Sequence, residues 1–249
     1  MFDLMDAHVH LQHPLLSRDI EGVFRRAKAA GVKRLACNGT EPRDWPRVLA
    51  LAEEHPEVVP FFGLHPWYVP EAREDWARVL EGFLDKRASG VGETGLDATK
   101  GDAAAQEAAF RTQLGMARER RLPIVVHCVR AWGRLMDLLR GEGPLPGGML
   151  LHAYSGPAEL LAPLAKLGAY FSFAGFTLED RRKKVLESLR AAPLDRLLLE
   201  TDAPDPKYGG EPSELPAVLS RAAVLRGMKE PELARIVWEN AARAFGRLW

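Results

Sequence analysis

Apolar runs of strand length alternate with amphipathic helical stretches along the whole chain, and this alternation limits the possible folds more than any other feature. The predicted strands are Leu4–His10, Val32–Cys37, Val58–Leu64, Gly90–Gly92, Pro123–Cys128, Met149–His152, Ala169–Phe173 and Arg196–Thr201. The predicted helices are Arg18–Ala30, Arg43–His55, Glu71–Lys86, Ala103–Arg121, Ala131–Arg140, Pro157–Leu167, Leu178–Ala191, Ser213–Arg226 and Glu230–Phe245. Eight strands joined through helices by short connections predict an α/β fold of the (β/α)₈ type, a TIM barrel.

The length of the chain, 249 residues, is usual for one such barrel. Hydrophobic residues make up 47% of the chain, which is enough for a large core. We find no linker, low-complexity segment or internal repeat. The sequence therefore predicts a single domain over residues 1–249.

The charge, the cysteines and the apolar stretches of the chain bear on its binding partners and on the compartment where it is expected. Lys and Arg together number 34, as do Asp and Glu, so net charge gives no argument for nucleic-acid binding, although a local basic patch is possible. The sequence shows neither a signal-peptide pattern nor an apolar stretch of about 20 residues, so we expect a cytoplasmic protein outside membranes, a monomer or weak oligomer. Cys37 and Cys128 end apolar runs without a CxxC pattern, as buried reduced thiols do.

The pentapeptide Asp6-Ala7-His8-Val9-His10 lies at the end of the first predicted strand. Because side chains alternate along a strand, Asp6, His8 and His10 are expected on one face. The intervening Ala7 and Val9 are expected on the other face. With a rise of roughly 3.3 Å per residue, the two imidazoles lie about 6.6 Å apart and can converge on one divalent metal ion. We expect Asp6, deeper on the same face, to orient a histidine.

Further potential ligands follow later strands. They are Glu93 after the fourth strand, His127 after the fifth, His152 after the sixth and Asp202 after the eighth. The carboxyl ends of barrel strands face one mouth, where active sites lie, so these residues become neighbours despite their separation in sequence. Three to five nitrogen and oxygen ligands suit one or two divalent ions, and a carboxylate can bridge a pair. The chain is therefore interpreted as a metallohydrolase.

Other residues near strand ends are candidates for substrate binding. His65, at the end of the third strand, is either a further ligand or a donor to a substrate oxygen, and we favour the second role. Trp67 either stacks on a base or packs the barrel rim. Arg130, Arg181 and Lys207 are candidate contacts to a phosphate backbone or ordinary solvated charges. His13 is expected in a loop and His55 at a solvated helix end.

Six segments together resemble the TatD family of metal-dependent hydrolases, a deoxyribonuclease group among the amidohydrolase-like barrels. They are Asp6-Ala7-His8-Val9-His10, Gly63-Leu64-His65-Pro66, Gly92-Glu93-Thr94-Gly95-Leu96-Asp97, Pro123-Ile124-Val125-Val126-His127, His152-Ala153-Tyr154-Ser155-Gly156 and Leu199-Glu200-Thr201-Asp202-Ala203-Pro204. The resemblance extends from the first strand to the eighth. The chain departs from the family pattern at Arg130, which follows His127 by three residues instead of two, and at Asp205, where an apolar residue is common.

This resemblance implies two divalent ions, with magnesium, manganese and zinc as candidates. One ion would be held by His8, His10, Glu93 and Asp202, and the other by Glu93, His127 and His152. It also implies hydrolysis of phosphodiesters, often as a 3′-to-5′ exonuclease on DNA, with His65 at the scissile phosphate.

The expected mechanism uses a hydroxide between the ions that Glu93 bridges, with Asp202 accepting its proton. One alternative is a hydrolase of carboxylic esters, lactones or amides on the same barrel. Many such relatives carry a carboxylated lysine after the fourth strand, where this chain has Glu93. A second alternative is a non-catalytic binder, which would be expected to lack a ligand.

Overall fold

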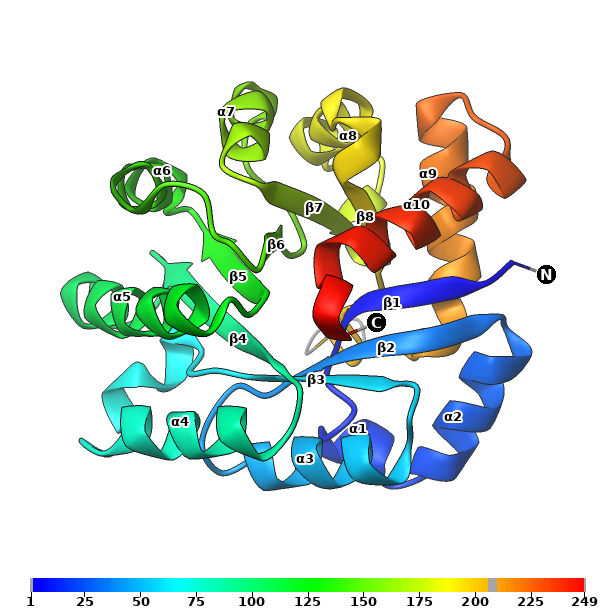
Figure 1. Cartoon of the computed structure of the whole chain (residues 1–249). Helices are drawn as coiled ribbons and strands as arrows, with labels where there is room; N and C mark the ends of the chain where they lie inside the picture. Colours follow the sequence, from blue (N-terminus) through cyan, green and yellow to red (C-terminus); the bar gives the residue numbers. More distant parts are fainter. Residues whose placement is uncertain (1, 206–209, 249) are drawn as a thin grey trace.

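The strands of the chain pair in sequence order into one parallel sheet that curls into a barrel in the computed structural model (Figure 1). The structure describes residues 2–205 and 210–248. The strands are β1 Leu4–Val9, β2 Val32–Asn38, β3 Val58–Phe62, β4 Gly90–Asp97, β5 Ile124–Val129, β6 Met149–Leu151, β7 Ala169–Ala174 and β8 Leu197–Glu200. Helices surround this sheet, so the predicted (β/α)₈ barrel is confirmed.

The helices that cover the barrel follow the predicted order. Those in the described residues are α1 Pro14–Ser17, α2 Ile20–Ala29, α3 Trp45–Glu54, α4 Trp76–Lys86, α5 Ala103–Arg120, α6 Trp132–Glu142, α7 Leu161–Lys166, α8 Lys183–Ala191, α9 Leu215–Arg226 and α10 Glu230–Phe245. None of them has the length and apolar character that a bilayer span requires.

Some predicted boundaries are wrong. The fourth strand is not limited to Gly90–Gly92 but continues to Asp97. The helix predicted over Glu71–Lys86 is divided into a 3₁₀ turn, Pro66–Glu71, and α4. The first residues of the helix predicted over Pro157–Leu167 form a 3₁₀ turn, Ala158–Leu160, before α7. Another 3₁₀ turn, Gly175–Leu178, precedes α8 and ends where the helix predicted over Leu178–Ala191 was expected to begin. Each of these differences lies at the carboxyl ends of the strands or in the connections that follow them.

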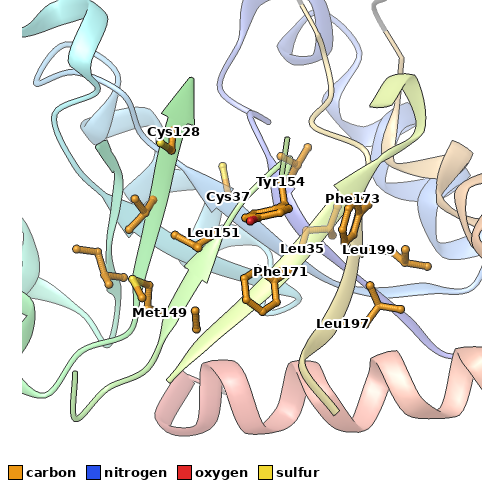
Figure 2. Close-up of a cluster of buried hydrophobic side chains, with 14 of the residues drawn as sticks. Leu35, Cys37, Cys128, Met149, Leu151, Tyr154, Phe171, Phe173, Leu197 and Leu199 are labelled. Carbon is orange, nitrogen blue, oxygen red and sulfur yellow. The ribbon is translucent and has the colours of Figure 1, made fainter. Parts of the chain in front are cut away.

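Two apolar layers hold the barrel together. The outer core lies between the strands and the helices, and Figure 2 shows part of it, including Phe171 and Phe173 of β7 beside Leu197 and Leu199 of β8. The inner core fills the barrel and consists of Met5, Ala7, Ala36, Val59, Phe61, Val125, Leu150, Tyr170, Leu198, Ala241, Ala244 and Phe245. Cys37 and Cys128 are buried free thiols of the outer core, as expected.

The first strand departs from strict alternation. Ala7 belongs to the inner core, whereas Val9 belongs to the outer core, so the prediction that they share one face is wrong. The pairing of β1 with β2 shifts register between Asp6 and Val9, which accounts for the difference.

Local hydrogen bonds join the segments at the carboxyl ends of β1 and β8. The backbone N–H of Asp202 donates to the carbonyl of His8 at 3.0 Å, and that of His10 donates to Ala203 at 2.8 Å. The Asp6 carboxylate accepts the backbone N–H of Thr201 at 2.9 Å and also its hydroxyl. Asp6 was expected to orient a histidine ring. Its carboxylate instead fixes the backbones that carry His8 and Asp202.

The end of the barrel opposite the strand carboxyl ends is filled by α10, whose last turn lies near the barrel axis (Figure 1). Phe245 contributes most to this plug and meets Phe61 of β3 edge to face, with ring centroids 5.5 Å apart. Because this end is packed with apolar side chains, access to the interior is from the other end.

Candidate metal centre

A cavity of about 1090 Å³ opens at the carboxyl ends of the strands. Its lining includes most of the predicted ligands: His10, Glu93, His127, His152 and Asp202, together with His65. His8, from β1, lies behind them and is fully buried. The strand ends thus bring all the predicted ligands to one place, as the barrel topology requires.

Glu93 of β4 lies at the centre of this cluster and faces histidines on two sides. Its Oε2 is 3.2 Å from Nε2 of His8 and 3.4 Å from Nε2 of His10. Its Oε1 is 3.0 Å from Nδ1 of His127 and 2.9 Å from Nε2 of His152. Oε2 therefore faces His8 and His10, whereas Oε1 faces His127 and His152 and also His65. A carboxylate with candidate ligands beside each oxygen can bridge two ions.

Asp202 completes the first of these two groups. Its Oδ1 lies 3.6 Å from Nε2 of both His8 and His10. Asp202 has φ 56°, an uncommon value for a residue other than glycine. Ala153 and Arg130, beyond β6 and β5, also have positive φ, at 41° and 54°. Such backbone conformations are typical of functional sites.

The outer nitrogens of three of the histidines lie near acceptors, and those of His10 and His127 are hydrogen-bonded to them. Nδ1 of His10 is 2.9 Å from the carbonyl oxygen of Asn38. Nε2 of His127 is 3.4 Å from Oδ2 of Asp97, and Nδ1 of His152 is 3.5 Å from Oε1 of Glu200. Ligand histidines in metalloproteins commonly have such carboxylate or carbonyl partners.

The ring of His8 is oriented differently. Its buried Nδ1 has no hydrogen-bond partner among the described residues. The ring instead stacks on that of His152, with centroids 3.9 Å apart. A cation bound by the carboxylates of the cluster would also be a partner for the inward Nε2 of His8 and of His152.

His65 reaches the cluster from the end of β3, with Nε2 3.2 Å from Oε1 of Glu93. Its Nδ1 accepts the backbone N–H of Trp67 at 3.1 Å, so Nδ1 carries no proton. Burial lowers the pKa of His65 to about 4, in spite of the attraction of Glu93, so the ring is neutral at pH 7. The single ring proton is therefore on Nε2, and His65 presents an N–H donor to the cavity.

The acids of the cluster are held ionised. Burial acts to raise the pKa of Glu93, but the charge of His152 and the hydrogen bond from His127 outweigh burial and place the pKa well below its ordinary value. The pKa of Asp202 is also lowered, because its hydrogen bond to His10 and the charge of His8 outweigh burial.

The donors fit divalent cations. Imidazole nitrogens and carboxylate oxygens converge in groups whose atoms lie within 4.8 Å of one another, among them His8, His10 and Asp202. Imidazole with carboxylate is a donor set that zinc and other transition ions favour.

A family model for the TatD-related DNases matches residues 5–246 of the chain, a range that includes every predicted ligand. The chain belongs to this family. The expectation of a metal-dependent TatD-type hydrolase is thereby confirmed.

Relatives that match over their full length agree with this membership. An uncharacterised metal-dependent hydrolase, YabD of Bacillus subtilis, is 34% identical over 97% of this chain and 98% of its own. A protein named 3′-5′ ssDNA/RNA exonuclease TatD, from Erwinia tasmaniensis, is 32% identical over 97% of this chain and 99% of its own. The crystal structure of YJJV, a TatD homologue from Escherichia coli, superposes with a TM-score of 0.92 and 29% identity, covering 98% of both chains.

Most of the other residues singled out in the sequence are near the cavity. Trp67, Arg130 and Arg181 line it, whereas Lys207 lies outside the described residues. One face of the Trp67 ring is covered by Lys100, whose Nζ is 3.6 Å from the ring centroid. His13 lies outside the helices, as expected, and caps α1, its ring accepting the N–H of Leu15.

His55 differs from its prediction. It ends α3 as expected, but its ring is not simply solvated, because it stacks on Phe24 with centroids 3.8 Å apart.

Asp97 and Glu200, which lie next to His127 and His152, were not predicted from the sequence. A signal was present, since both are acids within or at the end of buried strands, inside segments that carry the family resemblance. An acid in such a place is rarely buried without a partner.

Proposed function

We propose that this chain hydrolyses phosphodiester bonds at the 3′ end of single-stranded DNA with two divalent ions. The division of Glu93 between two pairs of histidines carries this proposal, because it provides separate positions for two cations. The name of the Erwinia tasmaniensis relative supports the choice of substrate. Glu93 is only 2% exposed, so a phosphate must enter the cavity to reach it. A flexible single strand can enter more readily than a stiff duplex.

The first ion would be held by His8, His10, Glu93 and Asp202, and the second by Glu93, His127 and His152. We infer that a transition ion such as manganese or zinc is retained more tightly than magnesium, because four of these ligands are imidazoles. When bound, the ions supply positive charge that polarises water and the phosphate oxygens.

The side chains around them perform the remaining tasks. The ionised carboxylate of Asp202, which lines the cavity, accepts the proton of the attacking water. The Nε2–H of His65 donates to a non-bridging phosphate oxygen, a bond that strengthens as negative charge develops there. Arg130 supplies a further donor for phosphate at the rim. The exposed part of Trp67 offers a surface for a base.

Hydrolysis of labelled oligonucleotides tests the proposal. Single-stranded DNA, duplex DNA, RNA, a generic phosphodiester and several lactones are incubated with protein in magnesium, manganese or zinc. Release of mononucleotides from the 3′ end of single-stranded DNA is the expected result, and turnover of lactones alone would refute it. Elemental analysis of protein purified without added metal identifies the retained ion.

Glu93→Ala is the matching variant. Removing the carboxylate that serves both histidine pairs should reduce turnover at least about 10³-fold in a folded protein. Glu53→Ala, at an exposed position on α3, is the control and should retain full activity. Unchanged turnover in metal-saturated Glu93→Ala protein would contradict the role of Glu93.

A further inference from the structure

Charge is distributed unevenly around the mouth of the cavity. The connection between β7 and α8 and the first residues of α8 contribute four consecutive cations to the lining, Arg181, Arg182, Lys183 and Lys184. Arg130, after β5, lines the same side. Because the strands are ordered β1 to β8 around the barrel, β5 and β7 are separated only by β6 (Figure 1). The cations therefore occupy one arc of the rim, which we call the basic rim.

The opposite arc of the rim is acidic. Glu41 and Asp44, which follow β2, line the cavity there, whereas Asp205 lines it after β8, the neighbour of β7. The Asp44 carboxylate is fixed by the backbone N–H and hydroxyl of Thr40 and by the amide of Gln12. A polyanion that enters the cavity is thus attracted by one arc and repelled by the other.

The stability of the fold does not explain the four cations. The first turn of a helix favours acidic residues, yet α8 begins with Lys183 and Lys184 and has no acid in its first turn. Both lysines are exposed. Arg181 and Arg182 both lie near the carboxylate of Glu179, with nitrogen–oxygen distances of 2.5 and 3.8 Å, and the segment 179–184 carries four cations against two acids. The segment therefore keeps an excess of positive charge at the mouth of the metal centre.

We propose that the basic rim, Arg130 with Arg181 to Lys184, binds successive phosphates of a single polynucleotide strand as it leaves the scissile bond at Glu93. This inference rests on the proposed function, which places a phosphodiester at the metal centre. Phosphate contacts dominate the affinity of proteins for nucleic acid, and the balanced net charge of this chain leaves that task to a local patch. The acidic arc directs the strand to one side of the mouth only.

The double variant Lys183→Gln/Lys184→Gln tests the basic rim. The KM for a 20-nucleotide oligothymidylate at 0.15 M salt should rise about ten-fold, with kcat changed less than two-fold. The slope of log KM against log salt concentration should fall by about 1.4, since each phosphate contact on a single strand contributes about 0.7. The loss should decrease as the oligonucleotide is shortened, because fewer phosphates then extend from the scissile bond towards the lysines.

The control is Lys33→Gln/Lys166→Gln, which removes the same charge from exposed positions. Lys33 begins β2 and Lys166 ends α7, so both lie at the far end of the barrel from the cavity. This control should bind and cleave the 20-mer as the unaltered protein does. An equal rise in KM for both double variants, or an equal loss on the 20-mer and a dinucleotide, would overturn the proposal.

A binding experiment separates this inference from the proposed function. Fluorescence anisotropy of a fluorescein-labelled 20-mer reports affinity without turnover, so it tests the basic rim even if no DNA is hydrolysed. Weaker binding by Lys183→Gln/Lys184→Gln than by the control supports binding of the strand at the basic rim. Equal affinity of the two double variants refutes it, whereas absence of DNA hydrolysis with every metal refutes only the proposed activity.

Discussion

Asp97 lies behind His127, on the side of the ring that faces away from Glu93. Its Oδ2 is 3.4 Å from Nε2 of His127 and accepts the indole N–H of Trp67 at 2.6 Å. Its Oδ1 accepts the backbone N–H of Thr99 at 2.8 Å and the hydroxyl at 2.6 Å. Burial acts to raise the pKa of Asp97, but the bonds to His127, Thr99 and Trp67 outweigh it and lower the pKa well below its ordinary value. A fixed anion therefore supports His127.

Asp97→Asn should weaken metal binding. The amide keeps the size of the carboxylate but removes the negative charge behind the ring, and loss of such a partner typically reduces metal affinity about 10- to 100-fold. Competition with a chromophoric zinc chelator measures the affinity. Asp137→Asn, at an exposed position on α6, is the control and should leave it unchanged. Equal zinc affinity in both variants would show that Asp97 does not support a ligand.

His65 should act as a donor to substrate and not as a metal ligand. His65→Ala should lower kcat about 10²- to 10³-fold, the usual effect of losing one donor to a developing oxyanion, while the bound metal per chain stays constant. His65→Gln places an amide N–H near the position of Nε2 and should recover part of the activity. Loss of one metal ion per chain in His65→Ala, by elemental analysis, would instead identify His65 as a ligand.

The sequence predicted the barrel and the clustering of the candidate ligands because both depend on periodic or local features. Parallel strands buried on both faces read as apolar runs, and such runs located β1 to β3 and β5 to β8. The strand β4 was truncated because Glu93, Thr94 and Asp97 interrupt its apolar character, although all of β4 is buried. Side chains from α5 make this burial possible: Gln113 donates to Thr94, and Gln106 bonds the backbone of Asp97.

Contacts that depend on ring orientation could not be predicted. Whether Nδ1 or Nε2 of His127 faces Glu93 depends on its rotamer, and that rotamer depends on Asp97, a residue 30 positions away. The role of Asp6 was mistaken for a related reason. Its carboxylate points to Thr201, directly after β8, a strand that is next to β1 only after the barrel closes.

Removing the plug of the barrel should destabilise the protein without altering the site. Phe245 is 2% exposed and packs on Phe61 inside the inner core. Phe245→Ala should lower the free energy of unfolding by about 3 to 5 kcal/mol, measured by urea denaturation. Val224→Ala, at a side chain 72% exposed on α9, should change it by less than about 0.5 kcal/mol. Since the metal centre is at the other end, the zinc affinity of the folded Phe245→Ala protein should be unaltered.

Cys37 should make stability fall in alkaline solution. Burial raises the pKa of its thiol from 9.0 to about 12, and its Sγ donates to Oε1 of Gln12 at 3.3 Å. Above pH 9 the unfolded chain loses this proton while the folded chain keeps it, so the unfolded state gains stability as pH rises towards 12.

For this one group, the free energy of unfolding should decrease by about 1.4 kcal/mol between pH 8 and pH 10. Cys37→Ala removes this contribution. Relative to the variant, the unaltered protein should therefore lose about 1.4 kcal/mol in its free energy of unfolding between pH 8 and pH 10. Urea denaturation at a series of pH values measures it, and comparison of the two proteins cancels the titration of lysines and tyrosines. Parallel pH profiles for the two proteins would mean that Cys37 titrates normally in the folded state.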